Sequence, residues 1–190
     1  WIIYWDVQQK YASNPVIEFL RQDAFERRVT ILPNWLMSAV QAPQEAQNQF
    51  QMLDQLYRIE WAQHLFYYYD IPSLDIVQMP RMPEDLKAFE HGFLAHPMAG
   101  GLPLPGLIRK WELSSTRYIL APLGFEALLN SQSDPEEKPF RSVYPFRIEP
   151  TPGQTRITKL EQFTAVPSTN GPFTVIEFTR ALPMAALFSQ

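Results

Sequence analysis

Residues 14–20 read NPVIEFL and residues 28–33 read RVTILP, and these two stretches decide the class of fold. Asn14 can cap a helix and Pro15 suits the first helical position, so we expect a helix from residue 15 to about residue 24. The second stretch is short, apolar and closed by Pro33, which is typical of a buried strand. A helix followed by a strand indicates an α/β protein.

The alternation of helix and strand continues up to about residue 130. Apolar residues spaced three and four apart predict a long helix with one buried stripe, formed by Phe50, Leu53, Tyr57, Trp61 and Leu65. Further strands are expected at residues 73–79 and 116–120. Between them we expect a helix from Pro83 and a short helix at residues 107–111; the first of these should bury Leu86, Phe89 and Phe93. This order predicts a mixed sheet with flanking helices.

The pattern changes after the polar segment 131–139. Strand-like segments follow, in which polar and apolar residues alternate, at 143–149, 156–166, 173–179 and 184–188. Turns are expected at residues 151–153 and 170–172. We therefore predict one α/β domain over residues 1–190, with an alternating α/β subregion at 1–130 and an antiparallel β meander at 140–190.

The composition narrows the classes of function. The chain has 0 cysteines and 3 histidines, which removes disulfide and thiolate chemistry and disfavours a zinc site. Its net charge of −4 is dispersed, without a basic stripe, so we expect no nucleic-acid partner. No apolar run reaches the roughly 18–20 residues that span a bilayer. The first residue is Trp1 and not Met, which indicates a processed or partial chain.

Short motifs do not assign a catalytic residue, a metal site or a cofactor. Gly100, Gly101 and Gly106 form neither a phosphate-binding loop nor a dinucleotide fingerprint. No Gly-x-Ser-x-Gly elbow is present for a serine nucleophile. His91 and His96 are five residues apart, which is a poor spacing for two ligands on one helix. We therefore expect no metal and no cofactor.

Two groups of residues remain as candidates for function. The acids Asp70, Asp75, Glu84 and Asp85 could act as a carboxylate pair on a sugar, although acids at these positions are also typical of turns and helix starts. The densest aromatic stretch is residues 61–70. A binding wall for a sugar or a lipid headgroup is one interpretation and a core or interdomain contact is the other; the candidate residues are Trp61, His64, Tyr67, Tyr68 and Asp70.

Several strings resemble one family in order along most of the chain. They are residues 14–20, residues 67–75, residues 111–120 (WELSSTRYIL) and residues 180–183 (RALP). Together they resemble the extracytoplasmic C-terminal domain of YfhO-like bacterial membrane proteins, which are similar to GT-C glycosyltransferases that use lipid-linked sugars. Met184 departs from the pattern, because family members often carry a basic residue there, and residues 37–48 match nothing in it.

The resemblance implies an accessory domain on the extracytoplasmic, periplasmic face of a membrane, tethered in the full-length protein. The catalytic carboxylate of such enzymes lies beside the membrane bundle, so this chain is expected to lack it. Implied partners are the protein's own transmembrane bundle and a glycan or lipid-linked sugar. Two alternatives stay open, namely a protein-interaction module without a glycan role and a glycoside hydrolase-like enzyme that uses paired carboxylates.

Overall fold

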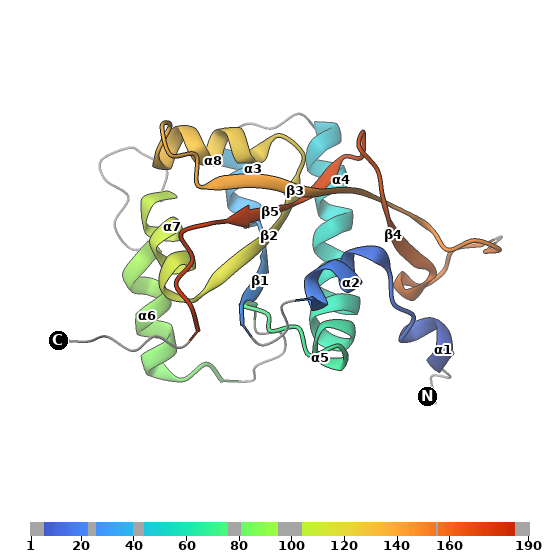
Figure 1. Ribbon diagram of the computed structural model, residues 1–190. Helices are drawn as coiled ribbons and strands as arrows, with labels where there is room; N and C mark the ends of the chain where they lie inside the picture. Colours follow the sequence, from blue (N-terminus) through green and yellow to red (C-terminus); the bar gives the residue numbers. More distant parts are fainter. Residues whose placement is uncertain are drawn as a thin grey trace.

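A computed structural model describes residues 6–22, 26–39, 44–75, 81–94, 104–154 and 156–184. It shows a mixed five-stranded sheet with helices on both faces (Figure 1). The predicted α/β class, a mixed sheet with flanking helices followed by an antiparallel strand-rich part, is therefore confirmed. The strand expected at residues 184–188 lies outside the described residues except for Met184.

The first elements follow the sequence pattern closely. A short helix α1 (Val7–Lys10) precedes α2 (Pro15–Arg21). The Asn14 side chain accepts hydrogen bonds from the backbone N–H groups of Val16 and Ile17, each at 3.0 Å, as predicted for a helix cap. Strand β1 (Arg28–Ile31) comes next.

A long crossover then joins β1 to β2 (Thr116–Pro122), which runs parallel to it. It contains only helices among the described residues: α3 (Asn34–Ala39), α4 (Gln44–Gln55), the π-helix η1 (Leu56–Leu65), α5 (Phe66–Tyr68), α6 (Glu84–Leu94) and α7 (Leu104–Leu113). The predicted apolar stripe from Phe50 to Leu65 is buried along its whole length. A continuous helical stretch over residues 44–68 thus carries one apolar face onto the sheet.

The C-terminal part adds α8 (Phe125–Ser133), β3 (Phe140–Pro150), the 3₁₀ turn η2 (Leu160–Gln162), β4 (Phe163–Pro167) and β5 (Phe173–Phe178). The sheet order is β1-β2-β5-β3-β4. A meander would place β5 beside β4, but β5 pairs with β2 and β3 instead, so the predicted meander is wrong. Strand β5 pairs with β2 on one side and with β3 on the other, and it therefore joins the predicted subregions 1–130 and 140–190 in one sheet.

Three smaller predictions also need correction. The segment expected as a strand from residue 73 makes only an isolated bridge between Ser73 and Val29, and residues 76–80 lie outside the described part. Within residues 156–166, only the last part belongs to a strand. The expected buried face of α6 is shallow: Phe89 stays 40% exposed, because α6 packs mainly on α7. Gly106 permits that packing, since a Cβ there would lie 1.9 Å from the Phe93 carbonyl oxygen.

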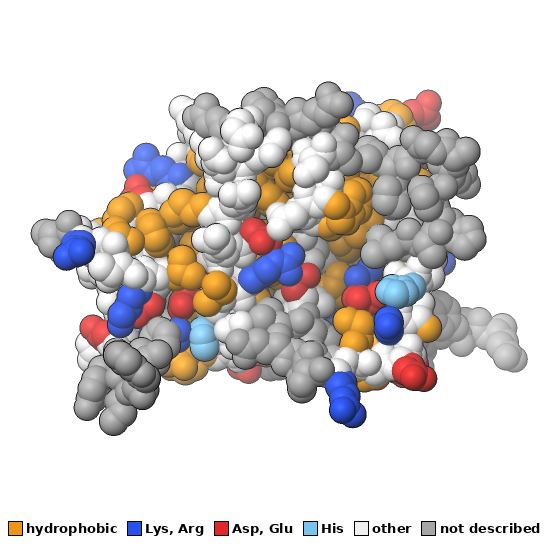
Figure 2. Space-filling view, turned by 180° about the vertical axis from the view of Figure 1, so that it is seen from behind, with side chains coloured by type: hydrophobic (Ala, Val, Ile, Leu, Met, Phe, Trp, Pro, Cys, Tyr) orange, Lys and Arg blue, Asp and Glu red, His pale blue; other side chains and the backbone are white. Residues whose placement is uncertain are grey.

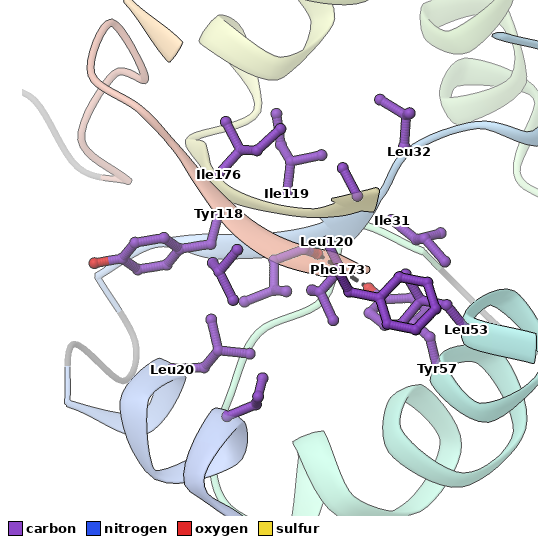
Figure 3. Close-up of a cluster of buried hydrophobic side chains, with 14 of the residues drawn as sticks. Leu20, Ile31, Leu32, Leu53, Tyr57, Tyr118, Ile119, Leu120, Phe173 and Ile176 are labelled. Atoms are coloured by element: carbon purple, nitrogen blue, oxygen red, sulfur yellow. Dashed lines mark hydrogen bonds between the residues drawn. The ribbon is translucent and has the colours of Figure 1, made fainter. Parts of the chain in front are cut away.

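The core lies on both faces of the central strands. Ile119 and Ile176 are register partners on β2 and β5 and point to one face (Figure 3). Leu120 lies on the other face, where helix α2 brings Leu20 and helix α4 brings Leu53. Side chains of a strand alternate between faces, so a strand covered on both sides is apolar throughout. Strand β2 fits this rule, because every residue in it except Arg117 is buried.

Candidate functional site

A cleft of about 370 Å³ lies between α1, η1 and the η2–β4 segment. Figure 1 shows these elements together at the end of the sheet where β4 lies. The volume is at the lower end of the range of about 300–1,000 Å³ that is typical of small-molecule sites. Its wall combines apolar side chains such as Trp61 and Leu65 with charged ones from three separate segments: Lys10, Glu60 and Glu161. Buried charges in a concave wall make this cleft the candidate site.

The π-helix η1 supplies the central part of the wall. It spans Leu56–Leu65, which is long for an element that usually appears as a single turn, and such turns are frequent at functional sites. Glu60 and Trp61 are both buried, and both line the cleft. The same element therefore contributes a charged residue and an aromatic residue to the lining of one cavity.

Lys10 and Glu60 form a buried ion pair across the cleft wall. The Lys10 ammonium donates to the two Glu60 carboxylate oxygens at 3.0 and 3.4 Å, and both side chains are only 4% exposed. Lys10 comes from the last position of α1, so the pair attaches α1 to η1. Such a pair contributes little net stability, because desolvation of both charges opposes their attraction. Its clearest effect is to hold a charged donor and acceptor at one place in the wall.

Glu161 brings a second carboxylate to the same cleft from η2. Its side chain is 3% exposed, and the Lys159 ammonium lies 3.5 Å from one of its oxygens. Each buried carboxylate of the wall thus has a lysine next to it. Each carboxylate can therefore accept hydrogen bonds beside a neighbouring ammonium group.

The His64 imidazole interacts electrostatically with Lys10, Glu60 and Glu161. Its pKa is lowered below the ordinary 6.5, first by burial and then by the Lys10 ammonium, while Glu60 and Glu161 oppose the shift. The imidazole is therefore neutral at pH 7 and offers one donor and one acceptor.

The other predicted aromatic residues lie on the surface beyond η1. Tyr67 and Tyr68 are 55% and 60% exposed. The Tyr68 ring contacts the Tyr11 ring with centroids 4.7 Å apart, and the Tyr69 hydroxyl donates to the Tyr11 carbonyl at 2.8 Å. Tyr11 stands between Lys10 and Ala12, both of which line the cleft. We call Tyr11, Tyr67, Tyr68 and Tyr69 the tyrosine cluster.

Asp70 has a structural role at the end of this helical stretch. Its φ of 58° is left-handed, a conformation that Asp tolerates better than most residues. Asp70 and Ile71 donate their backbone N–H groups to the carbonyls of Tyr67 and Phe66, which is the Schellman pattern of a helix end. Of the five candidates, Trp61 therefore lines the cleft, His64 adjoins it, Tyr67 and Tyr68 are exposed, and Asp70 ends the helix.

The four acids considered for sugar chemistry do not come together. Asp75 accepts hydrogen bonds from Thr30 and Ile31 at the end of β1, and it lies near the Arg58 guanidinium. The pKa of Tyr57 is raised well above its ordinary value of 10, first by burial and then by the charge of Asp75. Glu84 and Asp85 occupy the first turn of α6. None of them lines the cleft, whose carboxylates are Asp6, Glu60 and Glu161.

Other surfaces of the described residues have fewer features of a binding site. A hollow of about 480 Å³ borders Arg117 and Leu182, but Arg117 is already paired with Glu177. Over the described residues, no group of three His, Cys, Asp or Glu side chains is arranged to hold a metal ion. In the part of the face drawn in colour in Figure 2, positive and negative side chains are interspersed without a basic patch.

Sequence reasoning missed Lys10, Glu60 and Glu161. They are far apart in the chain and carry no motif, so only their shared burial identifies them. The one local signal was the position of Glu60 next to Trp61, a member of the predicted apolar stripe. No protein-family model matches the chain, and no curated protein or solved structure is significantly similar to it. Function is therefore inferred from the geometry of the cleft.

Proposed function

We propose that the domain is a non-catalytic binding module that holds a carbohydrate, or the sugar headgroup of a glycolipid, in the cleft between α1, η1 and η2. The observation that carries the proposal is the set of buried charged groups in a concave wall that also holds Trp61. Sugars present hydroxyl groups that both donate and accept hydrogen bonds, together with apolar ring faces. A wall of fixed polar groups beside an aromatic side chain has the matching chemistry.

The pairing of the cleft carboxylates with lysines favours binding over hydrolysis. A glycosidase needs one carboxylic acid that carries a proton and a second carboxylate that is ionised. In the cleft, the Glu60 carboxylate accepts hydrogen bonds from Lys10, and the Glu161 carboxylate lies 3.5 Å from the Lys159 ammonium. Both carboxylates are thus already engaged by lysines, and the module is proposed to act without chemistry of its own.

A titration with small sugars tests the binding. Neutral mono- and disaccharides of gluco and galacto configuration are added to the isotope-labelled chain, and amide NMR shifts are followed. We expect shifts at residues of α1, η1 and η2, with the largest near Trp61. Sugars that leave these amides unmoved at millimolar concentration would refute the proposal.

A matched pair of variants separates the cleft from the rest of the surface. Ala12 is exposed at the rim of the cleft, so Ala12→Trp fills the cleft without burying a new group. Ala127 is exposed on α8, outside the cleft, and Ala127→Trp adds the same bulk there. We expect the first variant to lose sugar binding and the second to keep it, with both retaining the unfolding midpoint of the wild type.

We propose that this module is tethered to a polytopic membrane protein and lies on the extracytoplasmic face of the membrane, as the family resemblance suggests. Among the described residues, no helix has the length and apolar character needed to cross a bilayer. The test is the full reading frame, in which flanking apolar segments of about 20 residues are expected. A frame without them would contradict the proposed tether and leave sugar binding untouched.

The exposure of the tyrosine cluster favours a second function, docking onto a protein surface such as the protein's own membrane bundle. Tyr67 and Tyr68 expose more than half of their surface, and tyrosine is enriched in protein interfaces. The double variant Tyr67→Ser/Tyr68→Ser should then weaken co-purification of the domain with the remainder of the full-length protein, expressed as a separate chain. Phe89→Ser on α6 is the control, because Phe89 is also exposed but lies on another element.

A further inference from the structure

We infer that the cleft prefers an amino sugar with a protonated amine over a neutral sugar, and that it rejects sugar phosphates. This inference rests on the proposed sugar-binding function and specifies the class of sugar. It follows from the charges that face the cleft, from how each is held, and from the polar groups between them.

The charge around the cleft is unbalanced. Three carboxylates line it, those of Asp6, Glu60 and Glu161, against a single ammonium, that of Lys10. Lys159 lies beside Glu161 at 3.5 Å and offsets part of this excess without being part of the cleft lining. His64 adds no positive charge at neutral pH, because burial and Lys10 lower its pKa. Counting Lys159, the groups around the cleft therefore carry one more negative than positive charge.

The carboxylates are held in place before any ligand arrives. Glu60 is fixed by two contacts with Lys10, and Glu161 is fixed on η2 with its side chain almost fully buried. Asp6 is the N-cap of α1 and accepts a hydrogen bond from the Gln9 backbone N–H at 3.1 Å. Fixed acceptors that need no rearrangement favour a cation more than mobile surface acids do.

The same arrangement disfavours anions. A phosphate group in the cleft would lose hydration and face these carboxylates, and like charges in a partly buried site repel strongly. The cleft lining also includes the uncharged polar residues Thr151 and Gln154, whose side chains can form hydrogen bonds with sugar hydroxyl groups. A ligand with several hydroxyl groups and one ammonium satisfies both features.

The test uses three ligands on the wild-type chain: D-glucosamine, D-glucose and glucose 6-phosphate, titrated at low salt and at a pH that keeps the amine protonated. The galacto series is run in parallel to separate charge from ring stereochemistry. We expect glucosamine to bind about tenfold more tightly than glucose, as one charged hydrogen bond provides, and glucose 6-phosphate more weakly than both. Added salt should reduce the advantage of the amine.

The outcomes separate the inference from the proposed function. Equal binding of glucose and glucosamine overturns the amine preference and leaves sugar binding intact. Tighter binding of glucose 6-phosphate also overturns it. If no neutral or amino sugar of either series binds, both the inference and the proposed function fail.

Variants assign the effect to particular carboxylates. Asp6→Asn removes a charge at the rim but keeps a good helix cap, so the fold should be unaffected. Its control is Asp134→Asn, because Asp134 accepts backbone hydrogen bonds from Glu136 and Glu137 in the turn after α8, away from the cleft. The ratio of glucosamine to glucose affinity should fall about threefold in Asp6→Asn and stay unchanged in Asp134→Asn.

Glu161→Gln, which is nearly isosteric, tests the buried carboxylate and should lower the same ratio further. The Asp6 variant keeps the experiment decisive if Glu161→Gln fails to fold. An unchanged ratio in both folded cleft variants would overturn the inference.

Discussion

The middle of the sheet and the wall of the cleft between α1, η1 and η2 both contain buried side chains, but the chemistry of these side chains is opposite. At the middle of the sheet, Ile119 and Leu120 of β2 meet Val175 and Ile176 of β5, all four at 0% exposure. At the cleft, Lys10 and Glu60 are 4% exposed in their side chains, yet both are charged. Burial alone therefore does not distinguish a structural region from a functional one.

The difference concerns what each region gains from burial. Apolar side chains gain about 25 cal/mol for each Å² removed from water, so the middle of the sheet is a source of stability. A buried ion pair loses hydration energy that its mutual attraction barely restores. A fold that keeps such a pair next to a cavity has given up stability there, and we interpret this as the mark of a binding site.

The largest expected effect comes from breaking the ion pair on one side. Glu60→Leu leaves the Lys10 ammonium buried without its carboxylate and should cost about 3–5 kcal/mol in the free energy of unfolding. The double variant Lys10→Met/Glu60→Leu removes both charges and should recover most of that loss. Urea unfolding of the wild type, of Lys10→Met, of Glu60→Leu and of the double variant measures these free energies. A double variant as unstable as Glu60→Leu would show that the pair is a structural element like the sheet.

A somewhat smaller effect is expected at the middle of the sheet. Leu120→Ala should cost about 3 kcal/mol, because it removes a fully buried side chain and leaves a cavity between the sheet and its helices. Leu123→Ala is the control, since Leu123 is 42% exposed and should change stability little. Sugar binding to the cleft should survive in folded Leu120→Ala. Loss of binding without loss of fold would contradict the separation of the two regions.

A residue that lines the cleft and also has a structural role gives an intermediate case. Asn14 lines the cleft and also caps α2 through two backbone N–H groups. Asn14→Ala should cost about 1 kcal/mol, whereas Asn14→Ser keeps a capping oxygen and should cost less. Thermal unfolding compares them. Equal losses in the two variants would mean that packing of the Asn14 side chain matters more than its cap.

The smallest expected effect is a dependence of stability on pH. Because the pKa of His64 is lowered in the folded chain, the unfolded chain binds its proton more readily. The His64 contribution is therefore constant well above pH 6.5 and is lost as the pH falls from there through the lowered pKa. The difference in unfolding free energy between wild type and His64→Gln should shift against the wild type over that window. If the difference in unfolding free energy were independent of pH, the prediction that the cleft charges and burial lower the pKa of His64 would be wrong.

Local patterns predicted much of the fold because their causes are local. The cap at Asn14 needs only the first turn of its own helix, and the stripe from Phe50 to Leu65 follows from helical periodicity. The order of strands could not be predicted in this way. The position of β5 between β2 and β3 depends on which sheet edges are free once the helices have packed. The sequence of residues 173–178 contains no signal for that choice of partners.

The candidate site shows the same division. The aromatic stretch 61–70 was visible as a binding hypothesis, and the structure divides it between the cleft (Trp61), the surface (Tyr67 and Tyr68) and a helix end (Asp70). By itself the sequence determined the α/β class, the helix caps and the apolar stripes, because each depends on residues a few positions apart. Only the tertiary structure brought Lys10, Glu60 and Glu161 to one cavity, because charges interact through space and their spacing along the chain has no bearing on where they meet.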